Sequence, residues 1–202
     1  MAIDIVFFAL LALFLGWRLY SVLGQRVGAM QTTQTPRTAA PKIFPPRRRK
    51  AVIAESAQPG IAALQQAEPD FDPDHFLEGA NIAYETIVTA FAQGNRAAFR
   101  PLLDDATYAH FCAVIDEREA NGQRVEFHLI GISRSEIVAC AREDTMARIE
   151  VTFTSQHIQA IYDRAGTLVS GDAKQIEIAD DHWSFARPLN AKDPNWRVVA
   201  TH

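Results

Sequence analysis

The pattern of apolar and polar positions divides the chain of 202 residues into three parts. The first contains an uninterrupted apolar run, Ile5–Trp17, which is followed by Arg18 and by the mainly apolar Leu19–Leu23. If the aliphatic stem of Arg18 lets its charge reach the headgroups, the apolar stretch is about nineteen residues long, close to what a bilayer requires. The pattern therefore predicts one transmembrane helix over residues 5–23, within an N-terminal anchor of residues 1–26.

A signal peptide and an interfacial amphipathic helix are the alternatives for this run. The segment before it, Met1–Asp4, has no Lys or Arg, whereas a secretory n-region is positive, and no small-x-small cleavage site follows. Trp17 and Tyr20 lie where an interfacial aromatic belt is expected. Positive charge lies on the C-terminal side of the run, so the positive-inside rule places the rest of the chain in the cytoplasm or an equivalent compartment.

The second part, residues 27–70, is rich in Thr, Pro, Gln and basic residues, which is typical of a disordered linker. It contains four consecutive cations, Arg47, Arg48, Arg49 and Lys50. Such a run is either a solvated part of the tether or a membrane-surface element that anionic lipid attracts; nuclear localisation and nucleic-acid binding are the remaining alternatives.

Charge is distributed unevenly along the chain. Residues 1–50 carry a net charge of +7 and residues 51–202 a net charge of −11, which gives −4 for the whole chain. An acidic folded part is a poor electrostatic partner for nucleic acid, so we expect no nucleic-acid binding.

The third part, residues 71–202, begins with helical patterns. Asp72-Pro73 predicts a helix start, and apolar residues then recur every three or four positions from Phe76 to Phe91. Gly94-Asn95 predicts its end. A short helix over Arg96–Leu103, interrupted at Pro101, and another from Asp104-Asp105 to Asn121-Gly122 follow.

The period then changes to two, which predicts strands. The predicted strands include Val125–Leu129, Ile149–Phe153, Ile158–Tyr162, Thr167–Val169, Lys174–Phe185 and Trp196–Thr201. Asp163–Gly166 predicts a hairpin turn between the third and fourth of these. Helices followed by antiparallel strands indicate an α+β domain, with helices packed on one face of a curved sheet that can enclose a pocket.

Three segments of this domain resemble the inner-membrane translocase subunit 44-like family. They are FLEGANIAYETIVTAFAQGNRAAFRPLL at Phe76–Leu103, GQRVEFHLIGI at Gly122–Ile132, and DHWSFARPLNAKDPNWRVVAT at Asp181–Thr201, the last being the most specific. The resemblance implies a cystatin-like or nuclear transport factor 2-like fold. With a single N-terminal anchor the chain is similar to bacterial members, which implies an inner-membrane location with the domain cytoplasmic.

The resemblance also implies a membrane-bound adaptor whose partner is a translocase, a chaperone or a ribosome. In mitochondria the family member recruits the matrix heat-shock chaperone to the translocase and associates with cardiolipin-containing membrane. We therefore expect a non-catalytic adaptor or scaffold. The first alternative is a lipid-binding or hydrophobic-ligand module that uses a pocket lined by Trp183, Phe185 and Trp196; these aromatic residues could equally be core.

The second alternative is a pocket enzyme. Asp180 and His182 are two residues apart on a predicted strand and share a face, as a carboxylate and a general base would. No further reactive group completes such a site, and His128 and His157 are interpreted as surface or hydrogen-bonded residues. No phosphate-binding glycine loop or zinc-ligand spacing indicates a cofactor or metal. Cys112 and Cys140 show no CxxC spacing, so reduced, largely buried thiols are expected in preference to a disulfide.

Overall fold

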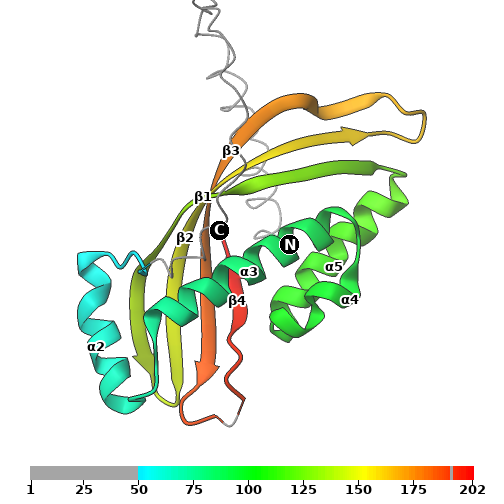
Figure 1. Cartoon of the computed structure of the whole chain (residues 1–202). Helices are drawn as coiled ribbons and strands as arrows, with labels where there is room; N and C mark the ends of the chain where they lie inside the picture. The colour runs from blue at the N-terminus through cyan, green and yellow to red at the C-terminus, as the bar shows by residue number, and fades with distance from the viewer. Residues whose placement is uncertain (1–49, 192) are drawn as a thin grey trace, which may run out of the picture. The chain divides into compact units, whose positions relative to one another are not determined.

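A computed structural model describes residues 50–191 and 193–202 of the chain (Figure 1). The predicted anchor over residues 5–23, linker residues 27–49 and the cations Arg47, Arg48 and Arg49 lie outside the described residues. Lys50, the last cation of the run, is described and exposed. Within the described residues no helix is both long enough and apolar enough to cross a membrane.

Helices precede strands, and the predicted α+β class is confirmed. The helices are η2 (Glu55–Ala57), α2 (Gln58–Ala67), α3 (Pro73–Ala92), α4 (Arg96–Phe99), η3 (Arg100–Leu102) and α5 (Asp105–Ala120). The strands are β1 (Arg124–Glu143), β2 (Met146–Tyr162), β3 (Leu168–Pro188) and β4 (Arg197–Thr201). They form one sheet in the order β1-β2-β3-β4, each pair antiparallel. Figure 1 shows that the three long strands curve and that α3 crosses the sheet.

The helix ends follow the local signals in the sequence. The side chain of Asp72 accepts a hydrogen bond from the Asp74 N–H at 2.9 Å and caps α3, and Asp104 caps α5 by accepting from the Thr107 N–H at 2.8 Å. These bonds satisfy backbone N–H groups that a helix start leaves without intrahelical partners. Gly94 and Gly122, with φ of 70° and 65°, lie just past the ends of α3 and α5, where a left-handed residue reverses the chain.

The strands are fewer and longer than the sequence pattern predicts. Ile149–Phe153 and Ile158–Tyr162 are both parts of β2, and Thr167–Val169 and Lys174–Phe185 fall almost entirely within β3. The pairing register shifts at several points, among them Leu129/Gly131 and His157/Gln159. Each bulge interrupts the apolar alternation and bends the strand, so one bent strand looks like two short ones in the sequence.

Residues 51–70 do not belong to the linker that the sequence analysis placed there. Ile53 forms a parallel bridge with Ile137 on β1, and the buried Ile61 and Leu64 of α2 belong to the main core cluster. The helix also lies very close to β1, since a Cβ atom on Gly60 would be 1.9 Å from the Cys140 carbonyl oxygen. The helix α2 has only ten residues and two large apolar side chains, too few to distinguish it from linker in the sequence. The folded domain therefore begins near Ala51.

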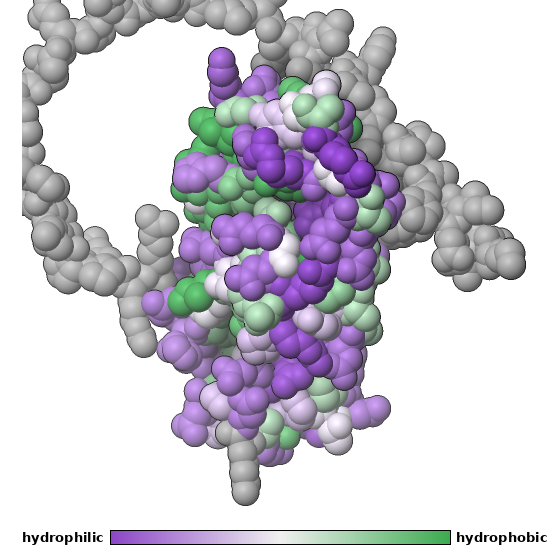
Figure 2. All heavy atoms as spheres, turned by 90° about the vertical axis from the view of Figure 1, so that its right-hand side faces the viewer, coloured by the Kyte–Doolittle hydropathy of each residue, from purple (hydrophilic) through white to green (hydrophobic). Residues whose placement is uncertain are grey.

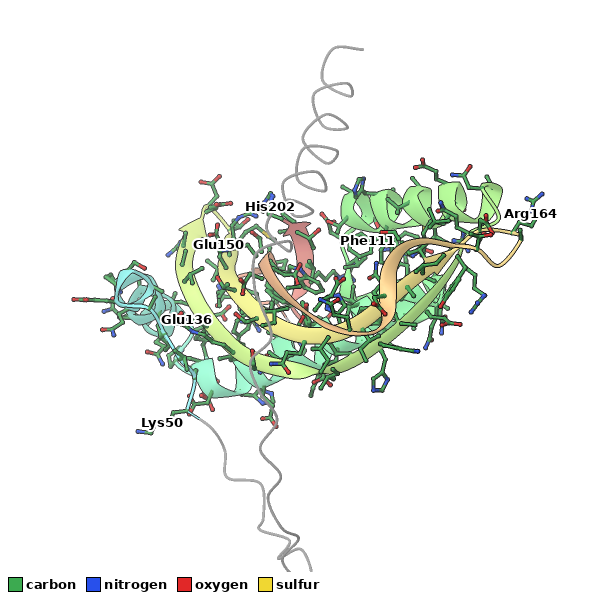
Figure 3. The ribbon with its side chains drawn as sticks, turned by 90° about the horizontal axis from the view of Figure 1, so that it is seen from above. Lys50, Phe111, Glu136, Glu150, Arg164 and His202 are labelled. Atoms are coloured by element: carbon green, nitrogen blue, oxygen red, sulfur yellow. The ribbon has the colours of Figure 1, made fainter. Side chains whose placement is uncertain are left out.

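The first turns of α3 face the core. Phe71, just before α3, and Phe76 and Leu77 within it are buried in the core cluster that includes residues of the sheet. Burying each side chain of this size contributes about 1.5–3 kcal/mol. Lys50 and Arg164 lie at opposite ends of the domain (Figure 3). The start of the described domain and the turn between β2 and β3 are therefore well separated.

Candidate functional site

Two cavities lie along α3. The first, which we call the Trp196 cavity, has a volume of about 680 Å³ and lies between the end of α2, the first half of α3 and the segment that follows β3. Its aromatic lining residues are Phe71, Phe76, Phe185 and Trp196. The second, the Asp181 cavity, has a volume of about 450 Å³ and lies between the second half of α3, α5 and the sheet. Its lining includes Tyr84, Phe91, Phe111, Phe127, Asp181 and Trp183. Both volumes are in the range of small-ligand pockets.

Aromatic rings in edge-on or tilted contact form the apolar wall of the Trp196 cavity. The Phe76 ring meets the Trp196 ring at 5.0 Å and the Phe185 ring at 5.6 Å, both edge-on, and Phe71 lies 6.0 Å from Trp196. Edge-to-face geometry places the positive ring edge on the negative ring face, which adds about 0.5–1.5 kcal/mol per pair to the apolar burial. The wall is therefore a preformed aromatic surface.

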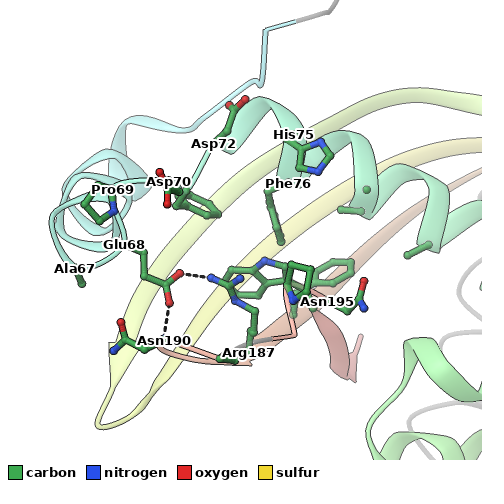
Figure 4. A pocket seen from close by; sticks show the side chains of 18 of the residues that line it. Ala67, Glu68, Pro69, Asp70, Asp72, His75, Phe76, Arg187, Asn190 and Asn195 are labelled. Atoms are coloured by element: carbon green, nitrogen blue, oxygen red, sulfur yellow. Dashed lines mark hydrogen bonds and ion pairs between the residues drawn. The ribbon is translucent and has the colours of Figure 1, made fainter.

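A buried ion pair closes one side of this cavity (Figure 4). Glu68 accepts a hydrogen bond from the Arg187 guanidinium, and their side chains are only 11% and 13% exposed. The other Glu68 oxygen accepts the backbone N–H of Asn190 at 2.8 Å. The guanidinium also lies over the Trp196 ring, 5.0 Å from its centre. Glu68 thus ties the end of α2 to the end of β3, and the Arg187 charge has a partner.

The rim of the Trp196 cavity is acidic. Asp70 and Asp72 are exposed lining residues, and His75 follows them on α3 (Figure 4). Asp72 is occupied in part as the cap of α3. Asp74, two residues further on, accepts the backbone N–H of Ala51 at 2.7 Å and joins the start of the domain to α3. Asp70 and Asp72 therefore place two carboxylates where the apolar cavity opens.

A polar network lies against the Asp181 cavity. The Tyr84 hydroxyl donates a hydrogen bond to Asp181 Oδ2 at 2.6 Å, and the Ser155 hydroxyl lies 2.8 Å from the Tyr84 oxygen. A tyrosine hydroxyl has a single proton to donate, so Ser155 is the donor in the second bond. His157 Nε2 is 3.9 Å from Glu177 on the neighbouring strand, and its ring lies 5.1 Å from Phe127.

Burial governs the protonation of this network. Burial raises the pKa of Asp181 above its ordinary value, and the hydrogen bond from Tyr84 opposes that shift. Burial and the contact with Asp181 both raise the pKa of Tyr84 well above its usual range. Ser155 is only 1% exposed, so its hydroxyl is covered and cannot meet a substrate as a nucleophile. The network ties α3 to the sheet and gives the cavity one polar side.

Comparison with known families identifies the domain. The family model described as the Tim44-like domain matches residues 57–202. The chain belongs to the Tim44-like domain family. Tim44-like domains are in general membrane-associated, non-catalytic adaptors linked to protein translocation. The match begins inside η2, which agrees with a domain that includes α2.

Other comparisons add little to this Tim44-like assignment. The crystal structure of the intermembrane space region of the chloroplast protein ARC6 is similar, with 13% sequence identity and a TM-score of 0.39, over 60% of this chain and 94% of that chain. No curated protein matches the sequence.

The structure divides the predicted pocket residues of this Tim44-like domain between the two cavities. Phe185 and Trp196 line the Trp196 cavity, whereas Trp183 lines the Asp181 cavity. Trp183 and Phe185 are 4% and 2% exposed, so they are core residues whose edges reach a cavity. Trp196 is only partly buried. The three residues do not form a single lining.

Asp180 and His182, the candidate catalytic pair of the enzyme alternative, face outward. Asp180 and His182 share a face, as predicted, but both are exposed and neither lines a described cavity. The Thr154 hydroxyl donates to Asp180 at 2.7 Å, and His182 Nδ1 lies 3.3 Å from the Thr152 hydroxyl. Strand alternation instead turns Asp181 inward. Among the described residues no group of three His, Cys, Asp or Glu side chains is placed to hold a metal ion.

Sequence reasoning missed the polar residues that the fold brings to the cavities. Asp181 lies between two polar residues, so nothing in its own neighbourhood marks it as buried. Tyr84 was assigned to the apolar face of its helix, and a buried tyrosine hydroxyl usually needs a partner; that was the available signal. The pairing of Glu68 with Arg187, 119 positions later, carries no local signal.

Proposed function

We propose that this Tim44-like protein is a membrane-tethered, non-catalytic adaptor that presents its domain to a protein partner in protein translocation or membrane-protein biogenesis. The observation that carries this proposal is the Trp196 cavity. It offers aromatic surface at an open rim, and its two most buried ionic groups, Glu68 and Arg187, bind each other. A surface of this kind suits docking of apolar side chains, because it provides area and shape without a reactive group.

The tether in this proposal comes from the sequence. A helix over residues 5–23 would hold the domain at the cytoplasmic face of a bacterial inner membrane, with the linker ending where Ala51 meets α3. The hydrogen bond from the Ala51 N–H to Asp74 supports a defined entry point for the chain. The basic run Arg47–Lys50 immediately precedes that point and would lie near anionic headgroups, each cation contributing about 1 kcal/mol to surface attraction.

A second function rests on the Asp181 cavity. Its walls are largely apolar, with Phe91, Phe111 and Trp183 among them, and it has one polar side at Asp181. A module that binds lipid or another hydrophobic ligand would use this shape, with the apolar part among the rings and a hydroxyl or amide near the carboxyl group. Loss of hydrophobic-ligand binding in a Val88→Trp variant, with the partner complex intact, would separate this function from the adaptor function.

A pocket enzyme centred on His182 is the third candidate, and the outward position of the imidazole weakens it. The test is replacement of His182 by Ala in the full chain and assay for complementation of a deletion phenotype. Full complementation would exclude a catalytic His182. Loss of complementation with an intact fold would favour the enzyme over the adaptor.

Site-specific photocrosslinking in membranes tests the adaptor function. A photoreactive amino acid is placed at His75 or Asn195, both on the rim of the Trp196 cavity, and at Ile82 on the exposed side of α3 as the control. We expect a reproducible protein adduct, identified by mass spectrometry, from the two rim positions and little from Ile82. Adducts with lipid alone, or equal protein adducts from all three positions, would count against the proposal.

A further inference from the structure

The Trp196 cavity combines an apolar interior with an acidic opening. Among its described lining residues the carboxylates are Glu68, Asp70 and Asp72, and the only Lys or Arg is Arg187. Because Glu68 and Arg187 form a buried pair, their charges largely cancel for an incoming ligand. The other carboxylates that line the mouth are Asp70 and Asp72, of which Asp72 also caps α3.

The nearby helix start does not reverse this field. The N-terminus of α3 carries partial positive charge, but the Asp72 side chain accepts the Asp74 N–H and sets a carboxylate against it. The cavity therefore disfavours an anionic ligand: a phospholipid headgroup or a carboxylate would meet Asp70 and Asp72 at the rim. An occupant with positive charge beside an apolar group matches both features.

We infer that the Trp196 cavity binds a segment of the partner protein in which one or two bulky apolar side chains are flanked by Lys or Arg. The apolar side chains enter between Phe76 and Trp196, and the flanking cations stay at the rim near Asp70 and Asp72. This inference rests on the adaptor function proposed above and specifies the chemistry that the partner presents.

The size of the cavity agrees with such an occupant. A volume of about 680 Å³ accommodates a few side chains and not a whole folded element. Trp196 is partly buried, so its ring offers an accessible face in addition to its contacts with Phe76 and Phe71. The end of the domain formed by α4, α5 and the hairpin offers a more polar surface than the Trp196 cavity. Figure 2 shows this end as mostly hydrophilic, with hydrophobic residues gathered toward its upper left.

Three peptides of equal length test the inference. The first is Ac-Lys-Lys-Ala-Leu-Phe-Ala-Lys-Lys-NH₂, the second replaces every Lys by Glu, and the third replaces Leu-Phe by Ser-Ser. Each carries a fluorophore and is titrated with the full-length chain in phosphatidylcholine nanodiscs, with empty nanodiscs as blank. We expect saturable binding of the first peptide only. Equal binding of the acidic peptide, or of the Ser-Ser peptide, would overturn the inference.

Charge variants locate the binding. Asp70→Asn with Asp72→Asn removes two rim charges, and Asn at position 72 keeps a good helix cap. Glu85→Gln with Glu117→Gln removes two charges from exposed positions on α3 and α5 that line neither cavity. We expect the rim variant to raise the Kd of the first peptide about fivefold to tenfold and the control to change it less than about twofold. Equal effects would overturn the inference.

Two measurements separate this inference from the adaptor function. Tighter saturable binding of a fluorescent, monomeric short-chain phosphatidylglycerol than of the first peptide, each titrated separately, would assign the cavity to anionic lipid and overturn the inference. If the crosslinks from His75 and Asn195 still capture a protein in that case, the adaptor function stands and only the partner's chemistry is wrong. If the peptide binds as expected but no protein adduct forms in membranes, the adaptor function fails while the binding preference of the cavity holds.

Discussion

The Tyr84 hydroxyl on α3 donates a hydrogen bond of 2.6 Å to Asp181 on β3 and accepts one from Ser155 on β2. One hydroxyl therefore joins a helix to two neighbouring strands. The Tyr84 ring also stacks on Phe153 at 4.5 Å and lies 4.8 Å from Trp183. This contact fixes the second half of α3 over the sheet and thereby shapes the Asp181 cavity.

Replacing Tyr84 by Phe keeps the ring and removes the hydroxyl. Ser155, which is buried, then loses its acceptor, and Asp181, which is half-buried, loses its donor. We expect the free energy of unfolding to fall by about 1–3 kcal/mol, the cost of leaving buried polar groups without partners. Equilibrium unfolding in urea measures this loss of free energy. Tyr162→Phe, on the same sheet, is the control, and an equal loss in both variants would contradict this role for Tyr84.

Replacing Asp181 by Asn tests its protonation. Burial raises the pKa of Asp181 in the folded chain above the ordinary 3.8, so the folded state binds this proton more tightly than the unfolded state does. The stabilisation that the protonated Asp181 side chain gives the folded state is present at low pH. It is lost as pH rises from the ordinary pKa through the raised pKa. Asn cannot titrate, so we expect the stability of the wild type relative to Asp181→Asn to fall as pH rises from about 4 toward neutral.

Unfolding of both proteins in urea at several pH values measures that difference. Asp180→Asn removes the same charge from the outer face of β3 and is the control. A difference that is independent of pH for Asp181, or an equal slope for the two positions, would show that burial of Asp181 does not govern its titration.

Replacing Gly60 by Ala tests the docking of α2. The new Cβ atom would lie 1.9 Å from the Cys140 carbonyl oxygen, which is backbone and cannot move aside freely. We expect a loss of about 1–3 kcal/mol in the free energy of unfolding, as for other overpacked positions. Gly79→Ala is the matched control, because nothing lies within 4 Å of its added Cβ atom and Ala favours a helix by about 0.5–1 kcal/mol.

Alkylation of Cys140 gives a second readout of the same change. Burial raises the pKa of Cys140 to about 11, so little thiolate is present near neutral pH and alkylation is slow. If α2 is displaced in Gly60→Ala, the thiol becomes more exposed and its alkylation, followed by mass spectrometry of the peptide, accelerates. Unchanged rates in a destabilised variant would mean that the strain is relieved elsewhere.

Replacing Glu68 by Gln leaves the Arg187 guanidinium buried without a counter-ion. We expect a loss of about 3–5 kcal/mol in the free energy of unfolding, since a buried charge that loses its partner keeps its desolvation cost. Adding Arg187→Met removes that charge, so the double variant should recover much of the stability. Chemical unfolding of the wild type, both single variants and the double variant gives the interaction free energy between the Glu68 and Arg187 side chains. Additive losses would show that the two side chains do not act as a pair.

The parts of the fold that depend on neighbouring residues were predictable. Asp72-Pro73, Gly94 and Asn121-Gly122 give helix boundaries because capping and a left-handed residue act within one turn. The interrupted short helix at Pro101 likewise appears as α4 followed by η3. Strand existence also follows from alternation, but strand length does not, because each bulge shifts the pattern by one residue and hides the continuity.

Parts that depend on distant partners were not predictable. The helix α2 is short and has two large apolar residues, Ile61 and Leu64, among Pro, Gly, Ala and Gln. Residues 51–67 therefore looked like linker. Trp183 and Phe185 are two residues apart and share a strand face, yet α3 crosses that face and separates the cavities that they reach. Which of Asp180 and Asp181 faces inward is set by the register of β3 against β2, which no local pattern specifies.

By itself, then, the sequence determined the order of helices and strands, the α+β class and the charge asymmetry, because short-range sterics, capping and composition act along the chain. Only the tertiary structure decided that Asp181 and Tyr84 meet, that Glu68 neutralises Arg187, and that aromatic residues from α3, β3 and the segment after β3 form one cavity wall. These contacts join residues about 100 positions apart, and their energy exists only once burial has removed water from both partners.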